Sequence, residues 1–216
     1  MATPTEENYL KALLALADTE GRTTTSQLSE ALGVSTPSVN SMVRKLHERG
    51  LVDYRKYQPL SLTPQGRKAA ALVIRKHRLT EMFLVDVMGF GWEEVHNIAE
   101  QIEHVDSPAF FNRMDKLMGH PTVDPHGSPI PTAEGVMEMP DHRRLDDCMV
   151  GETVTIIGLD HSSNDFLHYL NGRQLALHTK LTVLEQEEFD GSLTVSYAGH
   201  PREVLSRIVA QKLLVE

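Results

Sequence analysis

The sequence predicts a mainly α-helical protein that ends in a small β domain. Apolar residues recur at helical spacing through most of the first 118 residues, a proline-rich stretch follows, and short Val- and Thr-rich runs occupy the end. We expect an N-terminal winged helix-turn-helix, a helical dimerisation domain and a C-terminal SH3-like barrel. The expected domains are residues 1–66, 67–142 with a connector from about 119, and 150–216.

Two short helices joined by a tight turn form the first recognisable motif. A helix over Asn8–Ala17 precedes them. Thr25 is a suitable N-cap for a helix over Gln27–Leu32, and Gly33 ends that helix as a C-terminal glycine does. The next helix begins with Pro37 in its first turn. This arrangement predicts a helix-turn-helix.

Two predicted strands, 51–54 and 60–63, follow around a polar turn and form a wing. Seven basic and only two acidic residues lie between Val34 and Lys68, which favours contact with DNA phosphates. The alternative is a winged-helix core that binds another protein. The residues expected to face base edges are Ser35, Thr36, Pro37, Ser38, Asn40 and Ser41, and those expected to bind phosphates are Arg44, Lys45, Arg55 and Lys56.

Histidine and glutamate recur on two predicted helices, 65–88 and 92–105, which precede a third over 108–118. Residues three and four apart share a helix face, and imidazole and carboxylate groups bind divalent first-row metals. The two clusters are His77 with Glu81, and His96, Glu100, Glu103 with His104. A solvated helix face is the alternative for one such pair. Two clusters among apolar positions on consecutive helices favour a metal site with room for more than one ion.

Residues 119–216 divide into a connector and a β domain. Five prolines and little apolar periodicity mark residues 119–150 as a connector and linker. Predicted strands 153–157, 181–184, 193–197 and 212–215, with a helix over 163–170, fit a small barrel.

Composition limits the classes of protein that fit. The chain has 216 residues and a net charge of -9, so only the local basic region favours a polyanion partner. Its lone Cys148 cannot form an internal disulfide. No apolar stretch is long enough for a bilayer and no signal-peptide pattern opens the chain, so we expect a cytoplasmic protein without a membrane partner.

Several short motifs occur in an order that is specific as a set. They are Glu7-Asn-Tyr-Leu10, Leu60-Ser-Leu-Thr-Pro-Gln-Gly66, Arg75-Lys-His-Arg-Leu79, Glu94-Val-His96, Glu103-His104, Asp124-Pro-His-Gly127 and Pro129-Ile-Pro131. With the terminal barrel, they give nearly the whole chain a resemblance to the diphtheria-toxin-repressor family of iron- and manganese-dependent repressors.

The resemblance implies two metal sites. The primary, activating site would use Glu100, Glu103 and His104 with the side chain of Asn8. The ancillary site would use His77, Glu81 and His96, and some members add ligands at positions that here are Asp124, His126 and Asp160. This chain departs from other members by carrying Asn8 where they have Asp or Met, and Lys11 where one manganese-sensing branch has Glu.

The resemblance also implies a function and a metal. Glu100 stands where iron-sensing relatives use Cys, and the resulting nitrogen and oxygen ligand set favours Mn(II), with Fe(II) as the alternative. Zn(II) and Co(II) should also bind in vitro. The expected protein is no enzyme but a homodimeric, metal-activated repressor of metal-uptake genes that binds double-stranded operator DNA.

Two other functions fit parts of the sequence. A helical enzyme with two metal ions would explain the His and Glu clusters but not the basic wing. A metal-independent winged-helix regulator that binds an organic ligand would explain the wing but not the clusters.

Overall fold

A computed structural model describes residues 2–138, 140–160 and 162–216. The chain divides into two compact units, one of residues 1–83, 97–122 and 130–138, the other of residues 84–96, 123–129 and 139–216. Within the described ranges, no helix combines the length and the apolar character that crossing a membrane requires.

The first helix, α1, spans Pro4–Ala15 and begins four residues earlier than the sequence analysis predicted. A capping box explains this start. The Thr3 side chain accepts a hydrogen bond from the Glu6 backbone N–H, and the Glu6 carboxylate accepts one from the Thr3 N–H. The earlier start determines which α1 residues share a face.

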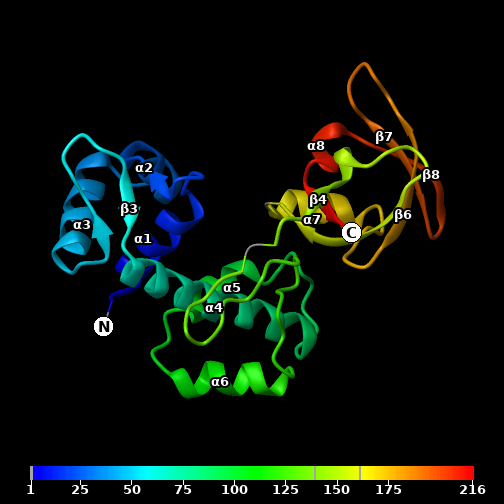
Figure 1. The fold of residues 1–216 in the computed structure, drawn as a ribbon. Coiled ribbons are helices and arrows are strands. Elements are labelled where there is room, and N and C mark those ends of the chain that lie inside the picture. Colours follow the sequence, from blue (N-terminus) through cyan, green and yellow to red (C-terminus); the bar gives the residue numbers. More distant parts are fainter. Residues whose placement is uncertain (1, 139, 161) are drawn as a thin grey trace. The chain divides into compact units, whose positions relative to one another are not determined.

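Helices α2 (Thr25–Leu32) and α3 (Thr36–Glu48) form the predicted helix-turn-helix (Figure 1). Gly33 ends α2 with a φ of 62°, as expected for a left-handed C-cap. The predicted N-cap was wrong by one residue, because Thr24 and not Thr25 caps α2. Thr24 caps the helix because it forms a capping box with Gln27. The Thr24 hydroxyl accepts from the Gln27 backbone N–H, and the Gln27 side chain accepts from the Thr24 backbone N–H.

Strands β2 (Val52–Asp53) and β3 (Leu60–Leu62) form the predicted wing. A strand that the sequence analysis missed, β1 (Arg22–Thr23), pairs with the other edge of β3, which gives the antiparallel order β1-β3-β2. The core beneath this sheet includes Tyr9, Leu10, Leu13, Leu28, Val39, Val43, Leu46, Leu60 and Leu62.

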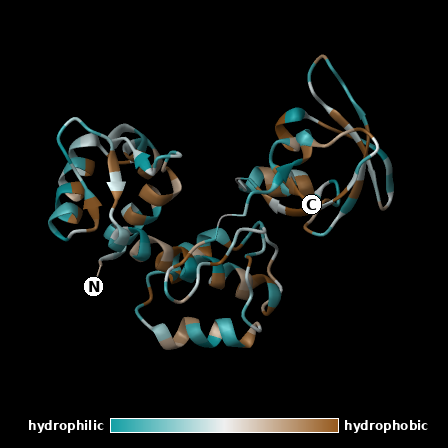
Figure 2. Cartoon of the chain, in the orientation of Figure 1, coloured by the Kyte–Doolittle hydropathy of each residue, from teal (hydrophilic) through white to brown (hydrophobic). Residues whose placement is uncertain are grey.

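Helix α4 (Pro64–Asp86) starts against the wing. A Cβ at Gly66 would lie 1.9 Å from the Leu51 carbonyl oxygen, so only glycine allows this approach. Helix α6 (Pro108–Leu117) alternates hydrophobic and hydrophilic residues (Figure 2). Arg75 links α4 to α6 because its guanidinium donates to the Asp115 carboxylate at 2.8 Å.

Helix α5 is shorter than predicted. It spans only His96–Ile102, whereas the sequence analysis expected a helix over 92–105. Trp92 lies outside the helix, because its ring packs on the core of the β domain and its Nε1 donates to Asn171 Oδ1 at 2.8 Å. Tertiary packing therefore overrides the helical periodicity of this segment.

The β domain is a six-stranded antiparallel sheet with the order β4-β9-β5-β6-β7-β8. Its strands β5, β6 and β7 each carry a register shift, which bends the sheet around its core. The elements are β4 (Arg143–Arg144), a 3-10 turn η1 (Leu145–Asp147), β5 (Thr153–Leu159), α7 (Asn164–Asn171), β6 (Lys180–Gln186), β7 (Leu193–Tyr197), β8 (His200–Leu205), α8 (Arg207–Ala210) and β9 (Leu213–Val215).

Four elements of this domain were not predicted: β4, η1, β8 and α8. Strand β8 lies at a sheet edge, and its largely exposed residues lack the alternation that reveals a half-buried strand. The buried core includes Ile156, Phe166, Leu170, Val183, Leu193, Val195, Leu205 and Leu213.

Candidate metal centre and nucleic-acid interface

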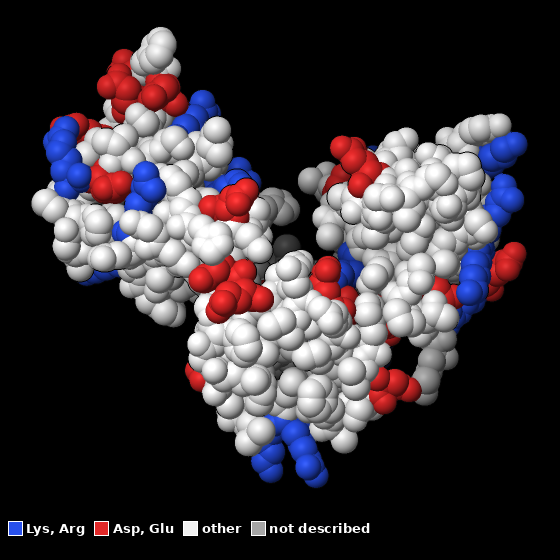
Figure 3. All heavy atoms as spheres, turned by 180° about the vertical axis from the view of Figure 1, so that it is seen from behind, with Lys and Arg blue, Asp and Glu red and all other residues white. Residues whose placement is uncertain are grey.

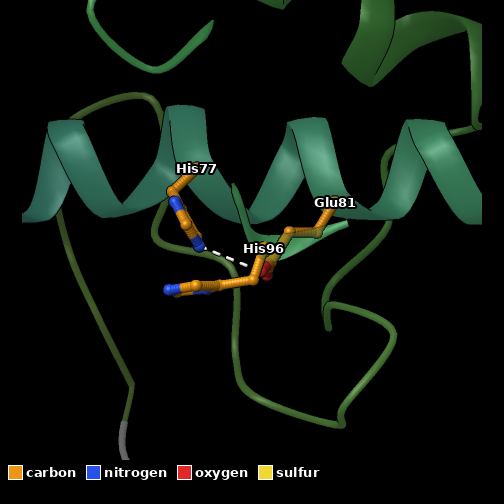
Figure 4. Close-up of side chains that lie close together, drawn as sticks. All are labelled: His77, Glu81 and His96. Atoms are coloured by element: carbon orange, nitrogen blue, oxygen red, sulfur yellow. Dashed lines mark hydrogen bonds and ion pairs between the residues drawn. The ribbon is translucent and has the colours of Figure 1, made fainter. Parts of the chain in front are cut away.

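His77 and Glu81 lie one turn apart on α4 and form the first predicted cluster. His77 Nε2 is 2.9 Å from Glu81 Oε1, and both side chains are buried (Figure 4). His96, the first residue of α5, is exposed. These three residues each offer one ligand atom, and the ligand atoms lie within 4.8 Å of one another. The predicted ancillary residues are therefore brought together.

Glu103 follows the end of α5 and is completely buried. Its carboxylate pairs with two cationic partners from other helices. His77 Nδ1 lies 2.6 Å from Glu103 Oε2, and Lys11 Nζ donates to Oε1 at 2.7 Å and to Oε2 at 3.0 Å. A buried carboxylate is stable only with such partners. Glu103 thus joins α4 to α1.

The two buried partners shift each other's pKa. Burial alone would lower the pKa of His77, but the carboxylates of Glu103 and Glu81 outweigh it and raise this pKa to about 9. Burial would likewise raise the pKa of Glu103, but hydrogen bonds from His77 and Lys11 hold that pKa below its usual range. His77, Glu81, Glu103 and Lys11 therefore form a set of ion pairs.

His104 has one partner from α1 and one from its own segment. Its Nδ1 lies 2.6 Å from Glu7 Oε2, and its Nε2 lies 3.7 Å from Glu103 Oε1. Both Glu7 and His104 are partly buried. With Nδ1 bonded to a carboxylate, Nε2 is the nitrogen that remains for a metal beside Glu103.

Two other predicted primary-site residues lie at the surface. Glu100 is about half exposed, and its Oε1 is 3.5 Å from Lys11 Nζ. Asn8 is exposed, and its side chain makes no hydrogen bond within the part of the chain that the structure describes. The structure therefore places Glu7, and not Asn8, against His104.

The remaining predicted ligands belong to the second unit. Asp124 and His126 are buried in the 123–129 loop, where Asp124 Oδ1 accepts a hydrogen bond from the His126 backbone N–H at 2.8 Å. The His126 ring stacks on Trp92 with 5.9 Å between centroids. Asp160 is engaged elsewhere, because Arg144 donates to its Oδ2 at 2.8 Å. The loop thus contains a buried carboxylate, that of Asp124, and a buried imidazole, that of His126.

The ligand chemistry of the predicted sites fits a divalent first-row metal. Every predicted side chain offers a carboxylate oxygen, an imidazole nitrogen or an amide oxygen, and none offers sulfur. Hard oxygen ligands with imidazole suit Mn(II) and Fe(II). The residues present therefore match the metal class that the sequence predicts.

The predicted DNA-reading residues lie on an exposed surface of α3 and the wing. All are exposed except Asn40, which is partly buried. Figure 3 shows Lys and Arg side chains along the outer edge of the part that carries α3. Ser35 is also the N-cap of α3, accepting from the Ser38 backbone N–H. Lys45 is not purely a phosphate ligand, because its Nζ lies 3.2 Å from Glu6 Oε1.

Glu7, which contacts the predicted ligand His104, was not among the predicted site residues. The signal was present in Thr3-Pro-Thr-Glu6, a capping-box pattern that places the start of the helix at Pro4. A helix with this start carries Glu7 and Lys11 one turn apart on one face. Those two residues are the ones that α1 directs at His104 and Glu103.

Comparison with known proteins gives family matches along nearly all of the chain. Residues 1–60 match the iron dependent repressor N-terminal DNA-binding domain, and residues 63–132 match the iron dependent repressor metal-binding and dimerisation domain. Residues 143–216 match the FeoA domain. The predicted SH3-like C-terminal domain is confirmed by this match together with the strand-rich fold.

Relatives and solved structures agree with these matches. The chain is 30% identical to the iron-dependent repressor IdeR of Mycobacterium bovis, over 98% of this chain and 96% of that protein. It is 38% identical to the transcriptional regulator MntR of Lysinibacillus sphaericus, over 54% and 81%. A manganese-dependent transcriptional repressor solved with manganese superimposes with a TM-score of 0.87 at 36% identity, over 98% and 99%. The chain belongs to the iron-dependent repressor family of metal-dependent, DNA-binding transcriptional repressors.

Proposed function

We propose that this repressor is activated by Mn(II), represses metal-uptake genes and binds its operator as a cytoplasmic homodimer. The observation that carries this proposal is the contact between α1 and the predicted primary site. Glu7 pairs with His104 and Lys11 with Glu103, so a helix of the DNA-binding part touches the residues that would hold the metal. A change in metal occupancy therefore reaches the DNA-binding part directly.

The proposed primary site consists of Glu100, Glu103, His104 Nε2 and Asn8. Glu7 orients the imidazole of His104 and keeps Nδ1 occupied. A bound divalent cation would supply the positive charge that lets these carboxylates stay close together. Because α1 contributes Asn8 and Glu7, the metal-bound arrangement favours one placement of α1, and DNA that selects this placement raises metal affinity by linkage.

We propose His77, Glu81 and His96 as the ancillary site, with Asp124 and His126 as further ligands. Asp124 and His126 are both buried and offer a carboxylate and an imidazole, which are ligand types of divalent first-row metals. Asp160 remains a proposed ligand only if its pairing with Arg144 is released. The proposed domains are 1–66, 67–142 and 150–216.

The choice of Mn(II) over Fe(II) rests on the absence of sulfur from the predicted ligand set. Fe(II) is the second candidate because the mycobacterial relatives are named as iron-dependent repressors. Zn(II) and Co(II) should bind in vitro, since the intrinsic affinity order places both above Mn(II). One related structure, ScaR, was solved with Zn²⁺.

The proposed homodimer would form through the helical part of the chain. On α6, Phe110 is 40% exposed and Leu117 is 73% exposed. Large apolar side chains on one short helix favour burial against a second copy. Two copies would place two recognition helices on successive turns of one DNA face.

Fluorescence anisotropy with an operator selected from random DNA tests the proposal. Mn(II) is expected to raise DNA affinity by about 100-fold or more over chelator, and Fe(II) under anaerobic conditions provides the comparison. His104→Ala should lose this response while it retains weak, nonspecific DNA binding. Equal affinity with Mn(II) and with chelator would overturn the proposal and favour a metal-independent regulator.

A further inference from the structure

Lys11 holds the carboxylate of Glu103 in the manner of a metal ion. Its Nζ lies 2.7 Å and 3.0 Å from the two carboxylate oxygens of Glu103, and 3.5 Å from Glu100 Oε1. The Glu103 side chain is fully buried, and the Lys11 side chain is only 21% exposed. One ammonium therefore spans two proposed metal ligands.

We propose that Lys11 is a resident cation of the primary site, which an activating metal must displace before it can bind. This inference rests on the proposed function. An ammonium and a metal compete for the same oxygen lone pairs, because Lys11 engages both oxygens of Glu103. The internal cation thus lowers the apparent metal affinity and raises the metal concentration at which the repressor responds.

The charges around Glu103 explain why an ammonium is stable there. Three further carboxylates share a partner with Glu103: Glu81 through His77, Glu100 through Lys11, and Glu7 through His104. A second lysine, Lys76, lies 3.8 Å from Glu7 and is directed at that carboxylate. Among the described residues, Lys11 is therefore the only lysine or arginine that pairs with Glu103. Loss of the Lys11 ammonium would leave a site with high affinity for another cation.

Lys11 also links α1 to the metal-binding part. The paired residues are 92 positions apart in sequence, so the ion pair is a tertiary contact between the DNA-binding and metal-binding parts. When a metal binds Glu103, the contact between Lys11 and Glu103 is replaced by a link between α1 and Glu103 through the metal ion. This exchange sets a threshold metal concentration, because the metal must bind Glu103 with a more favourable free energy than the Lys11 ammonium does.

Mn(II) titration of the free protein, followed by electron paramagnetic resonance, tests the displacement without DNA. Lys11→Gln should bind Mn(II) at least about tenfold more tightly than the unmodified protein, because the competing charge is gone. Lys11→Arg keeps a cation there and should not gain affinity. Lys116→Gln, an exposed lysine on α6, removes the same charge elsewhere and should change affinity less than twofold.

Chemical labelling of lysine amines gives a second measurement that requires no variant. Lys11 should react slowly with acetic anhydride in the metal-free protein and faster once Mn(II) is added, as read by peptide mass spectrometry. Unchanged or weaker Mn(II) affinity in Lys11→Gln, or unchanged Lys11 labelling, would overturn the displacement. Either result leaves the Mn(II)-dependent DNA binding of the unmodified protein untouched, so failure of the displacement is distinguishable from failure of the proposed function.

Discussion

Glu7 on α1 and His104, two residues beyond α5, share a 2.6 Å hydrogen bond across 97 positions of sequence. The bond occupies His104 Nδ1 and leaves Nε2 on the side of Glu103, at 3.7 Å from its Oε1. A carboxylate on the outer nitrogen of a ligating histidine orients the ring and raises its basicity. The orientation of this proposed ligand therefore depends on the position of α1.

Glu7→Ala should lower the affinity for Mn(II) by about 10- to 100-fold, because His104 loses the carboxylate that orients it. Mn(II) titration by electron paramagnetic resonance measures this directly. Glu30→Ala, at an exposed position of α2, is the matched control and should leave the affinity unchanged. Equal affinities for all three proteins would contradict a positioning role for Glu7.

Substitutions at Asn8 test whether it is a metal ligand. Asn8→Asp should tighten Mn(II) binding, because Mn(II) prefers a carboxylate to an amide oxygen, whereas Asn8→Ala should weaken it by about tenfold. The same titration is the measurement, with circular dichroism as a check on α1. If Asn8→Ala binds Mn(II) like the unmodified protein, the Asn8 side chain is not a metal ligand.

Glu6 predicts a pH-dependent contribution to stability. Burial would raise its pKa, but the Thr3 backbone N–H, Arg49 and Lys45 outweigh burial and lower the pKa from 4.5 to about 2. The folded pKa is the lower one, so the stabilisation is present above pH 4.5 and is lost as the pH falls toward 2.

Urea denaturation of Glu6→Gln across pH measures this contribution. At pH 7 the variant should lose about 1–3 kcal/mol of unfolding free energy, a range that allows for solvent around the exposed Arg49 and Lys45. The deficit should shrink below pH 4.5. A deficit that stays constant from pH 7 to 2 would show that the ionised carboxylate is not its source.

Arg44 on α3 is predicted to bind a DNA phosphate. Arg44→Ala should weaken binding similarly for all sequences and reduce the slope of log affinity against log salt by about 1. Anisotropy titrations over a range of salt concentrations provide the measurement, with the exposed Arg207→Ala on α8 as the control. A loss confined to one base position would instead assign Arg44 to base reading.

Local patterns were sufficient for much of the N-terminal half. Gly33 and Pro37 mark the turn between α2 and α3, because glycine permits the left-handed backbone that ends α2 and proline fixes φ in the first turn of α3. The interval of four residues between His77 and Glu81 likewise guarantees a shared helix face. Such features depend on neighbours in sequence and can be read without the fold.

Other features depended on contacts that no local pattern contains. The shortening of α5 at its N-terminal end follows from the packing of Trp92 on a core formed by residues between 145 and 215. The 123–129 loop is held close to β5, where a Cβ at Gly127 would lie 2.3 Å from the Ile157 carbonyl oxygen. Edge strand β8 lacks a pattern because little of it is buried.

The sequence by itself determined the kinds of groups available, namely two His and Glu clusters after a basic winged helix. Only the tertiary structure decided how α1 meets them, with Glu7 on His104 and Lys11 on Glu103. The physical reason is that ligand chemistry belongs to each side chain, whereas pairing across more than 90 residues depends on how helices pack. That packing buries Glu103, and a buried carboxylate is stable only when it pairs with a cation that the fold places beside it.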